Sequence, residues 1–188
     1  MTSIVVSAGT YHLPFHRLTD WVGQWYAQHP EVSLVVQHGP SDPVAGAQNH
    51  EILPYQDLLD QCLAADVVVL QGGAGGIMDM NRLGVIPIVV PRVPVDDEVV
   101  DDHQLIFTAE MARLGIIHCA TELAALHTLL DQACAAMISL RSDHPVQAPG
   151  IAGFAELELP PPRRRWGKTM TRLGKTMWAV GRQRLTRA

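Results

Sequence analysis

The sequence predicts an α/β fold in which a doubly wound parallel sheet carries helices on both faces. Short apolar runs rich in β-branched residues recur along the first half of the chain, as expected of strands buried on both faces. Segments with apolar residues at helical spacing lie between these runs. Strands that alternate with helices in this way form parallel sheets. A chain of 188 residues is long enough for one such domain and an appendage.

The N-terminal part of the chain begins this alternation. A β-branched run closed by glycine predicts the first strand at 3–9. Phe15, Leu18, Val22 and Trp25 recur at helical spacing, which predicts a helix over 14–28 with Pro14 in its first turn. A second strand is expected at 33–39. The segment 51–65 predicts a short strand, a turn and then a helix.

The following segments continue the same order. Strands are expected at 66–70 and 86–91, and the helix between them ends at Gly84, a typical C-cap. A long helix is expected over 97–115, again closed by glycine, and the run 116–119 predicts a final short strand. Thr121 stands where a capping box would begin a helix over 121–140, although Ala124 replaces the usual acid.

The charges are divided unevenly between the two ends of the chain. All 19 acidic residues precede residue 160, whereas nine of the 14 basic residues follow it. We therefore expect a domain over 1–141, a proline-containing linker over 142–162 and a basic tail over 163–188. The tail places apolar residues on one helical stripe, at Trp166, Met170, Leu173, Met177 and Val180.

A basic amphipathic helix favours an anionic membrane surface. The alternative is that the tail docks on the acidic body of the protein itself. Nothing in the body favours nucleic acid as a partner. The N-terminus does not resemble a signal peptide, and no run reaches the roughly 18 apolar residues of a membrane span. We therefore expect a cytoplasmic protein that is peripheral on the inner face of the plasma membrane.

Metal and covalent chemistry have no motif in the sequence. The three cysteines and nine histidines lack metal-ligand spacing, so we expect neither a metal nor another cofactor, and reduced, buried thiols. No nucleophile elbow or Cys-His arrangement is present.

Three loops should meet at the carboxyl edge of the predicted sheet, at 7–15, 71–79 and 90–104. The second contains GGAGG at the start of a helix, where backbone N–H groups bind anions. Asp79 lies one turn further on, where it can accept hydrogen bonds from ribose, so the pair suggests a nucleotide. Alternatively, the glycines only permit a tight turn and Asp79 only complements the helix dipole. The stretch matches neither the P-loop nor the dinucleotide fingerprint.

The order of several motifs resembles the C-terminal, donor-binding domain of family 28 glycosyltransferases. These motifs are GT-x-x-x-PF at 9–15, LPY at 53–55, ADVVV-x-x-GGAGGIMD at 65–79, LG-x-x-PIVVPR at 83–92 and DDHQ at 101–104. The chain is most similar to short bacterial subunits of split exopolysaccharide glycosyltransferases. It is more distantly similar to the catalytic subunit of the two-subunit eukaryotic enzyme that adds N-acetylglucosamine to dolichol-linked sugar. The resemblance covers about residues 3–140.

The resemblance implies a single Rossmann-like half of the GT-B fold that binds a UDP-sugar. It implies that the LPY segment covers the uracil, that Asp79 holds the ribose and that the glycines of both turns approach the diphosphate. The start of the helix after 101 would face the donor sugar, and Arg92 would add charge near the phosphates or the partner. The residues assigned in this way to the UDP-sugar are Gly9, Thr10, Leu53, Pro54, Tyr55, Gly72, Gly73, Ala74, Gly75, Gly76, Asp79, Arg92, Asp102, His103 and Gln104.

The implied activity is inverting transfer of a hexose or N-acetylhexosamine from UDP to a lipid-linked acceptor in exopolysaccharide or cell-surface glycan synthesis. A membrane-anchored partner subunit would carry the acceptor. His12 is the candidate for a residue near the reaction centre, with a surface histidine as the alternative. Many relatives have histidine where Gln71 stands and a hydroxyl-bearing residue where Gly76 stands. The alternative function is a catalytically silent subunit that binds a nucleotide sugar as a scaffold or sensor.

Overall fold

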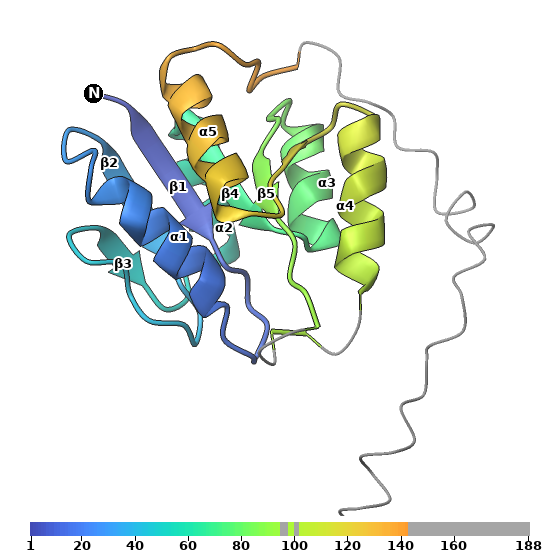
Figure 1. The fold of residues 1–188 in the computed structure, drawn as a ribbon, viewed down its shortest axis with the longest axis horizontal. Helices are drawn as coiled ribbons and strands as arrows, with labels where there is room; N and C mark the ends of the chain where they lie inside the picture. Colours follow the sequence, from blue (N-terminus) through green and yellow to red (C-terminus); the bar gives the residue numbers. More distant parts are fainter. Residues whose placement is uncertain (95–97, 100–101, 143–188) are drawn as a thin grey trace, which may run out of the picture. The chain divides into compact units, whose positions relative to one another are not determined.

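The computed structural model describes residues 1–94, 98–99 and 102–142. These residues form a parallel six-stranded sheet with the strand order β3-β2-β1-β4-β5-β6 (Figure 1). The doubly wound parallel sheet expected from the sequence is therefore confirmed. The strands are β1 (Ser3–Ser7), β2 (Ser33–Gln37), β3 (Gln48–His50), β4 (Val67–Gln71), β5 (Ile88–Val90) and β6 (His118–Cys119).

Helices cover both faces of the sheet (Figure 1). One face packs against α1 (His16–Tyr26) and α5 (Leu123–Cys134), and the other against α2 (Tyr55–Ala64), α3 (Ala74–Arg82) and α4 (His103–Arg113). Successive strand residues alternate between these faces: Ile4 and Val6 pack with the first group and Val5 with the second. Because both of their faces are buried, the central strands β1, β2, β4 and β5 are mainly apolar, which is the pattern that marked them in the sequence.

The sheet changes its direction of winding between β1 and β4. Strand β1 pairs with β2 on one side and with β4 on the other, where Ser7 is in register with Leu70. The chain leaves β1 toward α1 on one face and leaves β4 toward α3 on the other. Loops that part in this way leave a crevice outside the carboxyl ends of the strands, where open α/β sheets bind ligands.

Three helices begin later than the sequence predicted. Helix α1 begins at His16, so Pro14 precedes its first turn. Helix α4 begins at His103, not at residue 97, because Glu98 turns its carboxylate into the interior to meet Arg17 instead of continuing a helix. Helix α5 begins after Glu122, and no side chain caps it, so the capping box expected at Thr121 is absent. The helix ends at Cys134, since Ala136 takes the left-handed conformation (φ 53°).

The third strand also differs from its predicted position. Strand β3 covers Gln48–His50, just before the segment expected to contain it, and pairs with Val35–Gln37 of β2. It is a short edge strand with exposed or half-buried residues, so it lacks the apolar run that identifies the central strands. Across the described residues, no helix combines the length and the apolar character needed to cross a bilayer. The expected linker and basic tail lie outside the described residues.

Candidate nucleotide site

Three loops meet at the carboxyl edge of the sheet and are joined by the side chain of Arg92. They follow β1, β4 and β5, and Arg92 lies just after β5 with none of its surface exposed. Its guanidinium donates hydrogen bonds to four backbone carbonyl oxygens and one side-chain amide oxygen: those of Ala8, Leu13, Pro14 and Glu98, each at 3.0 Å, and Oε1 of Gln71 at 2.7 Å. One residue thus fixes the relative positions of all three loops.

This placement differs from the role expected of Arg92. The sequence resemblance suggested a charge directed at the phosphates or a partner, but the guanidinium donates to carbonyl oxygens inside the protein. Burial lowers the pKa of this guanidinium, and the Glu98 carboxylate opposes that shift. The rings of Phe15 and Tyr11 lie 4.6 and 5.5 Å from its central carbon, close enough for cation–π attraction. Arg92 therefore holds the loops of the site in position.

A second contact holds the loop after β5 against α1. Arg17 and Glu98 form a bidentate ion pair with distances of 2.7 and 2.8 Å, and Glu98 is 4% exposed. Glu98 also accepts the backbone N–H of Val93 at 3.0 Å, and Arg17 donates to the carbonyl of Pro91 at 2.8 Å. Most of the hydrogen-bonding capacity of the pair is thus satisfied, as a buried ion pair requires.

The turn from β4 into α3 provides an open helix N-terminus. Gly73 is the N-cap residue, no side chain caps the helix, and no acidic residue lies in the first turn. The first backbone N–H groups of a helix have no partner within the helix and carry a partial positive charge. This arrangement can bind an anion such as a diphosphate. The three exposed residues that begin the helix are Ala74, Gly75 and Gly76.

The glycines of this turn have different physical reasons to be glycine. A Cβ on Gly72 would lie 2.8 Å from Oε1 of Gln104 and 3.1 Å from Cα of Pro91, so close packing against α4 and β5 requires glycine there. A Cβ on Gly75 would meet no atom within 4 Å. Packing within the protein therefore explains why residue 72 is a glycine, but it gives no reason for a glycine at 75. A glycine without such a reason is expected where a ligand approaches the backbone.

The turn after β1 lies beside the turn after β4. Gly9 has φ +78°, and a Cβ on it would overlap the side-chain amide of Gln71. The backbone N–H of Gly9 donates to Ser7 Oγ at 3.2 Å. Thr10 and His12 are exposed, and the ring of His12 lies 4.5 Å from that of Tyr11. The two glycine turns expected from the sequence are therefore neighbours at the carboxyl edge, with Thr10 and His12 on the same loop.

The LPY segment and Asp79 also come together. The hydroxyl of Tyr55 donates to Asp79 Oδ2 at 2.8 Å, and Arg82 donates to Oδ1 at 3.1 Å. The backbone N–H of Leu53 donates to Oε1 of the buried Gln37 at 3.0 Å. Gln37 in turn bonds Ser7 Oγ at 3.0 Å, so the end of β2 joins the segment to the β1 turn. Pro54 is the N-cap residue of α2.

The first turn of α4 completes the edge. Asp102 is its N-cap residue, and Asp102 and His103 are both exposed. Gln104 is half-buried, and its Oε1 accepts the backbone N–H of Arg92 at 3.0 Å. Of the DDHQ motif, the structure therefore joins Gln104 to the β5 loop and leaves Asp102 and His103 on the surface.

Sequence reasoning missed the residues that organise these loops. They are Arg17, Gln37 and Glu98; Gln71 was noted as the position where relatives have histidine, but its hydrogen bond to Arg92 was not expected. Gln37 and Gln71 share a signal that could have identified them, because each is a polar residue that ends an otherwise apolar central strand. Arg17 and Glu98 carry no comparable signal, because they are 81 positions apart.

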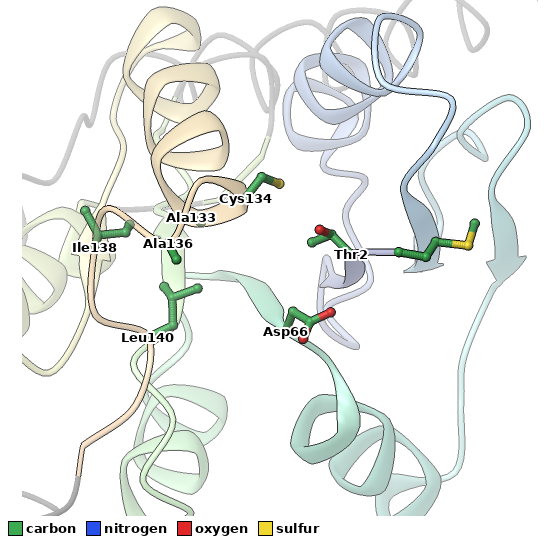
Figure 2. Close-up of a pocket in the computed structure, with 8 residues that line it drawn as sticks. Thr2, Asp66, Ala133, Cys134, Ala136, Ile138 and Leu140 are labelled. Atoms are coloured by element: carbon green, nitrogen blue, oxygen red, sulfur yellow. The ribbon is translucent and has the colours of Figure 1, made fainter.

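A separate pocket of about 430 Å³ lies at the opposite edge, beside the amino ends of β1 and β4 (Figure 2). Thr2, Asp66, Cys134, Ile138 and Leu140 contribute to its lining. The Asp66 carboxylate accepts hydrogen bonds from the N–H and hydroxyl of Ser3, both at 2.8 Å, which lower its pKa. Asp66 thus has a structural partner, and we assign no chemistry to this pocket. Within the described residues, no three His, Cys, Asp or Glu side chains are grouped to hold a metal ion.

Comparison with known families agrees with this geometry. The model of the glycosyltransferase family 28 C-terminal domain matches residues 8–137, from the β1 turn to the end of α5. The chain belongs to this family. The matched range contains every glycine turn described above, the LPY segment, Asp79 and the start of α4, so the family 28 domain includes the whole candidate site. No curated protein gives a significant sequence match.

Solved structures show the same fold as the family 28 domain. The glycosyltransferase of kitacinnamycin aligns with 23% identity and a TM-score of 0.53, covering 71% of this chain and 35% of that one. The calicheamicin glycosyltransferase CalG4 aligns with 18% identity and a TM-score of 0.53, covering 72% of this chain and 36% of that one. MurG of Acinetobacter baumannii aligns with 17% identity and a TM-score of 0.50, covering 70% of this chain and 40% of that one. The family 28 domain thus spans well under half the length of these proteins and is a Rossmann-like half of the GT-B type.

Proposed function

We propose that the family 28 domain is the donor-binding subunit of an inverting UDP-sugar glycosyltransferase. It would transfer a hexose or N-acetylhexosamine to a lipid-linked acceptor in exopolysaccharide or cell-surface glycan synthesis. The observation that carries the proposal is the uncapped N-terminus of α3, which lies beside the Gly9 turn and one turn before Asp79. The N-terminus of α3 can bind the diphosphate of a nucleoside diphosphate, and the Asp79 carboxylate on the same helix can bind its ribose.

The chemistry assigns a role to each part. The acceptor oxygen attacks the anomeric carbon as the bond from that carbon to the diphosphate oxygen breaks, and UDP leaves with the bonding electrons. The N–H groups of α3 stabilise the charge that develops on the leaving diphosphate. Asp79 accepts the ribose hydroxyls, the LPY segment covers the uracil, and the first turn of α4 faces the donor sugar. The acceptor proton needs a base, for which His12 on the β1 loop is the candidate from this chain.

The proposal includes a partner for the family 28 domain. The family 28 domain covers 35% to 40% of the three aligned glycosyltransferases. We propose that a membrane-anchored subunit supplies the remaining acceptor site, and that residues 163–188 bind the anionic inner face of the plasma membrane. The rival proposal is a catalytically silent subunit that binds a nucleotide sugar as a scaffold or sensor.

Turnover separates the two proposals. The chain is co-expressed with a candidate membrane-anchored partner subunit, and release of UDP is measured with a polyprenyl-linked acceptor and a panel of UDP-sugars. We expect release that depends on both subunits and is lost in Asp79→Ala. Binding of UDP without transfer to any acceptor would favour the scaffold, and absence of UDP binding would refute both proposals.

A further inference from the structure

We propose that a pocket beside α1 binds a saccharide ring of the glycan acceptor. This α1 pocket has a volume of about 290 Å³ and lies between the first turns of α1 and Glu98 of the loop after β5. Its link to the acceptor rests on the proposed function, whereas its affinity for a saccharide rests on its own side chains. The inference goes beyond the proposed function, which assigns the remaining acceptor site to a partner subunit.

The α1 pocket is lined mainly by planar polar side chains. Asp20 and Gln24 are four positions apart and therefore lie on one face of α1. His16 and Arg17 precede them on the same helix, and Glu98 adds a second carboxylate. A hydroxyl group both donates and accepts hydrogen bonds, so a sugar ring needs donors and acceptors around it. The pocket provides both, as guanidinium and amide donors and as carboxylate and amide acceptors.

The guanidinium of Arg17 is fixed in direction before any ligand binds. Its Nε and Nη2 donate to the two carboxylate oxygens of Glu98 at 2.7 and 2.8 Å, and Nη2 also donates to the carbonyl oxygen of Pro91 at 2.8 Å. Nη1 donates to no acceptor among the described residues, and 21% of the side chain is exposed. Nη1 therefore keeps two N–H bonds for a ligand. A donor that is already held binds at a lower entropic cost.

The remaining groups of the α1 pocket are also available. Asp20 and Gln24 are exposed, and their side chains have no hydrogen-bonding partner in the described part of the chain. Trp21 and Pro14 are half-buried and provide rings at the wall of the pocket. The C–H groups of a sugar can pack on such rings, and burial of that apolar surface is favourable.

The charges and shape of the α1 pocket disfavour other classes of ligand. Asp20 and Glu98 carry two negative charges and Arg17 one positive charge, so a phosphate group would meet net repulsion. No aliphatic side chain other than the Pro14 ring lines the pocket, so a lipid chain would bury polar groups without partners. An uncharged ligand with several hydroxyl groups fits both conditions.

The α1 pocket adjoins the loop that carries the candidate base. Pro14 lines the pocket, and its carbonyl oxygen accepts a hydrogen bond from Arg92 at 3.0 Å. The same loop carries His12, two positions before Pro14. A saccharide in the α1 pocket would therefore lie along the loop that leads to the proposed reaction centre.

Substitutions on α1 test the proposal without disturbing the core. The test variant carries Asp20→Ala and Gln24→Ala, both at exposed positions. The matched control carries Gln28→Ala and Glu31→Ala, which remove the same two kinds of group at exposed positions beyond the other end of α1. The full-length, isotope-labelled chain is titrated with cellotetraose, chitotetraose and mannotetraose, and shifts of its backbone amide NMR signals are recorded. The titrations are repeated with saturating UDP-glucose and UDP-N-acetylglucosamine.

We expect at least one tetrasaccharide to bind with saturation and to shift the signals of residues 14–24. The test variant should weaken that binding by roughly tenfold or more, because two hydrogen bonds are lost, and the control variant should bind like the wild type. The UDP-sugars should not displace the saccharide, because the donor binds in the candidate nucleotide site. With a partner subunit that supports turnover, the test variant should raise KM for the acceptor and leave KM for the UDP-sugar unchanged.

The outcomes separate this inference from the proposed function. Absence of a shift with all three tetrasaccharides would overturn the inference and leave the proposed function to its own test. Equal affinity of the test variant and the wild type would also overturn it, since the saccharide would then bind elsewhere. Displacement by a UDP-sugar would overturn it in favour of the donor-sugar position. Saccharide binding that is lost in the test variant, in a protein that binds no UDP, would support the α1 pocket and refute the proposed function.

Discussion

The hydroxyl of Tyr55 donates a 2.8 Å hydrogen bond to Asp79 Oδ2, which joins the start of α2 to the second turn of α3. This bond, with the negative charge of Asp79, raises the pKa of Tyr55. The Asp79 carboxylate is therefore already orientated by a hydroxyl group, and a ribose hydroxyl would bind in the same way. The Tyr55 side chain is largely exposed, so it can move aside at little cost.

Substitution of Asp79 should weaken nucleotide binding. We expect Asp79→Ala to lower UDP affinity by about 1–3 kcal/mol, because hydrogen bonds from ribose to a carboxylate are lost. Tyr55→Phe is the matched control, since it frees Oδ2 and should leave UDP affinity equal or higher. Calorimetry measures both. An unchanged affinity in a correctly folded Asp79→Ala variant would remove Asp79 from the site.

Two glycine substitutions in the β4–α3 turn should have opposite effects. Gly75→Ala meets no protein atom and should stabilise the first turn of α3 by up to about 1 kcal/mol, whereas UDP binding should weaken by about 1–3 kcal/mol through overpacking against the ligand. Gly72→Ala collides with Gln104 and Pro91 and should lower the free energy of unfolding by about 1–3 kcal/mol. Urea unfolding and UDP titration of both variants measure these effects. Wild-type UDP affinity in Gly75→Ala would show that no ligand approaches that residue.

The buried ion pair between Arg17 and Glu98 should be important for stability. We expect Glu98→Ala to lower the free energy of unfolding by about 2–4 kcal/mol, because it leaves a partly buried guanidinium without its carboxylate. Glu98→Gln retains an acceptor for the N–H of Val93 and should cost less. Urea unfolding of Glu98→Ala, Arg17→Ala and the variant that carries both substitutions gives the coupling energy of the pair. Additive effects of the two alanine substitutions would contradict the contact.

Cys62 should contribute to the loss of stability at high pH. Burial raises the pKa of its thiol from 9.0 to about 11, so the folded protein retains a proton that the unfolded chain releases. Its contribution should be constant below about pH 9 and should fall by at most about 1.4 kcal/mol per pH unit between the two pKa values. Unfolding of the wild type and of Cys62→Ala across pH 8–11 tests this. Parallel pH profiles for the two proteins would contradict it.

The basic tail should carry membrane binding. Truncation at Pro160 is expected to abolish flotation with phosphatidylserine liposomes and to leave UDP affinity unchanged, since the candidate site lies within residues 9–104. Persistent flotation of the truncated protein would contradict the assignment. A lower free energy of unfolding after truncation, without loss of flotation, would indicate that the tail docks on the acidic body instead.

The order of strands and helices could be predicted because apolar runs and helical spacing are local signals. The glycine turns were found for the same reason. The positions of β3 and of the start of α4 were missed, because both depend on partners that are distant in sequence: β3 pairs with β2, and Glu98 turns toward Arg17. The role of Arg92 could not be predicted either, since whether an arginine faces a ligand or the interior depends on which carbonyl oxygens the fold places around it.

The hydrogen bonds of Arg92 span long stretches of chain, since they reach Ala8 and Leu13, 84 and 79 positions away. Closing such large loops makes a contact slow to form, and sheets built from distant segments fold late. Until the chain has brought these loops together, no partly folded intermediate can form the complete candidate nucleotide site. Ligand affinity is thus a property of the finished fold, and a nucleotide that binds only there would act as a pharmacological chaperone for this chain.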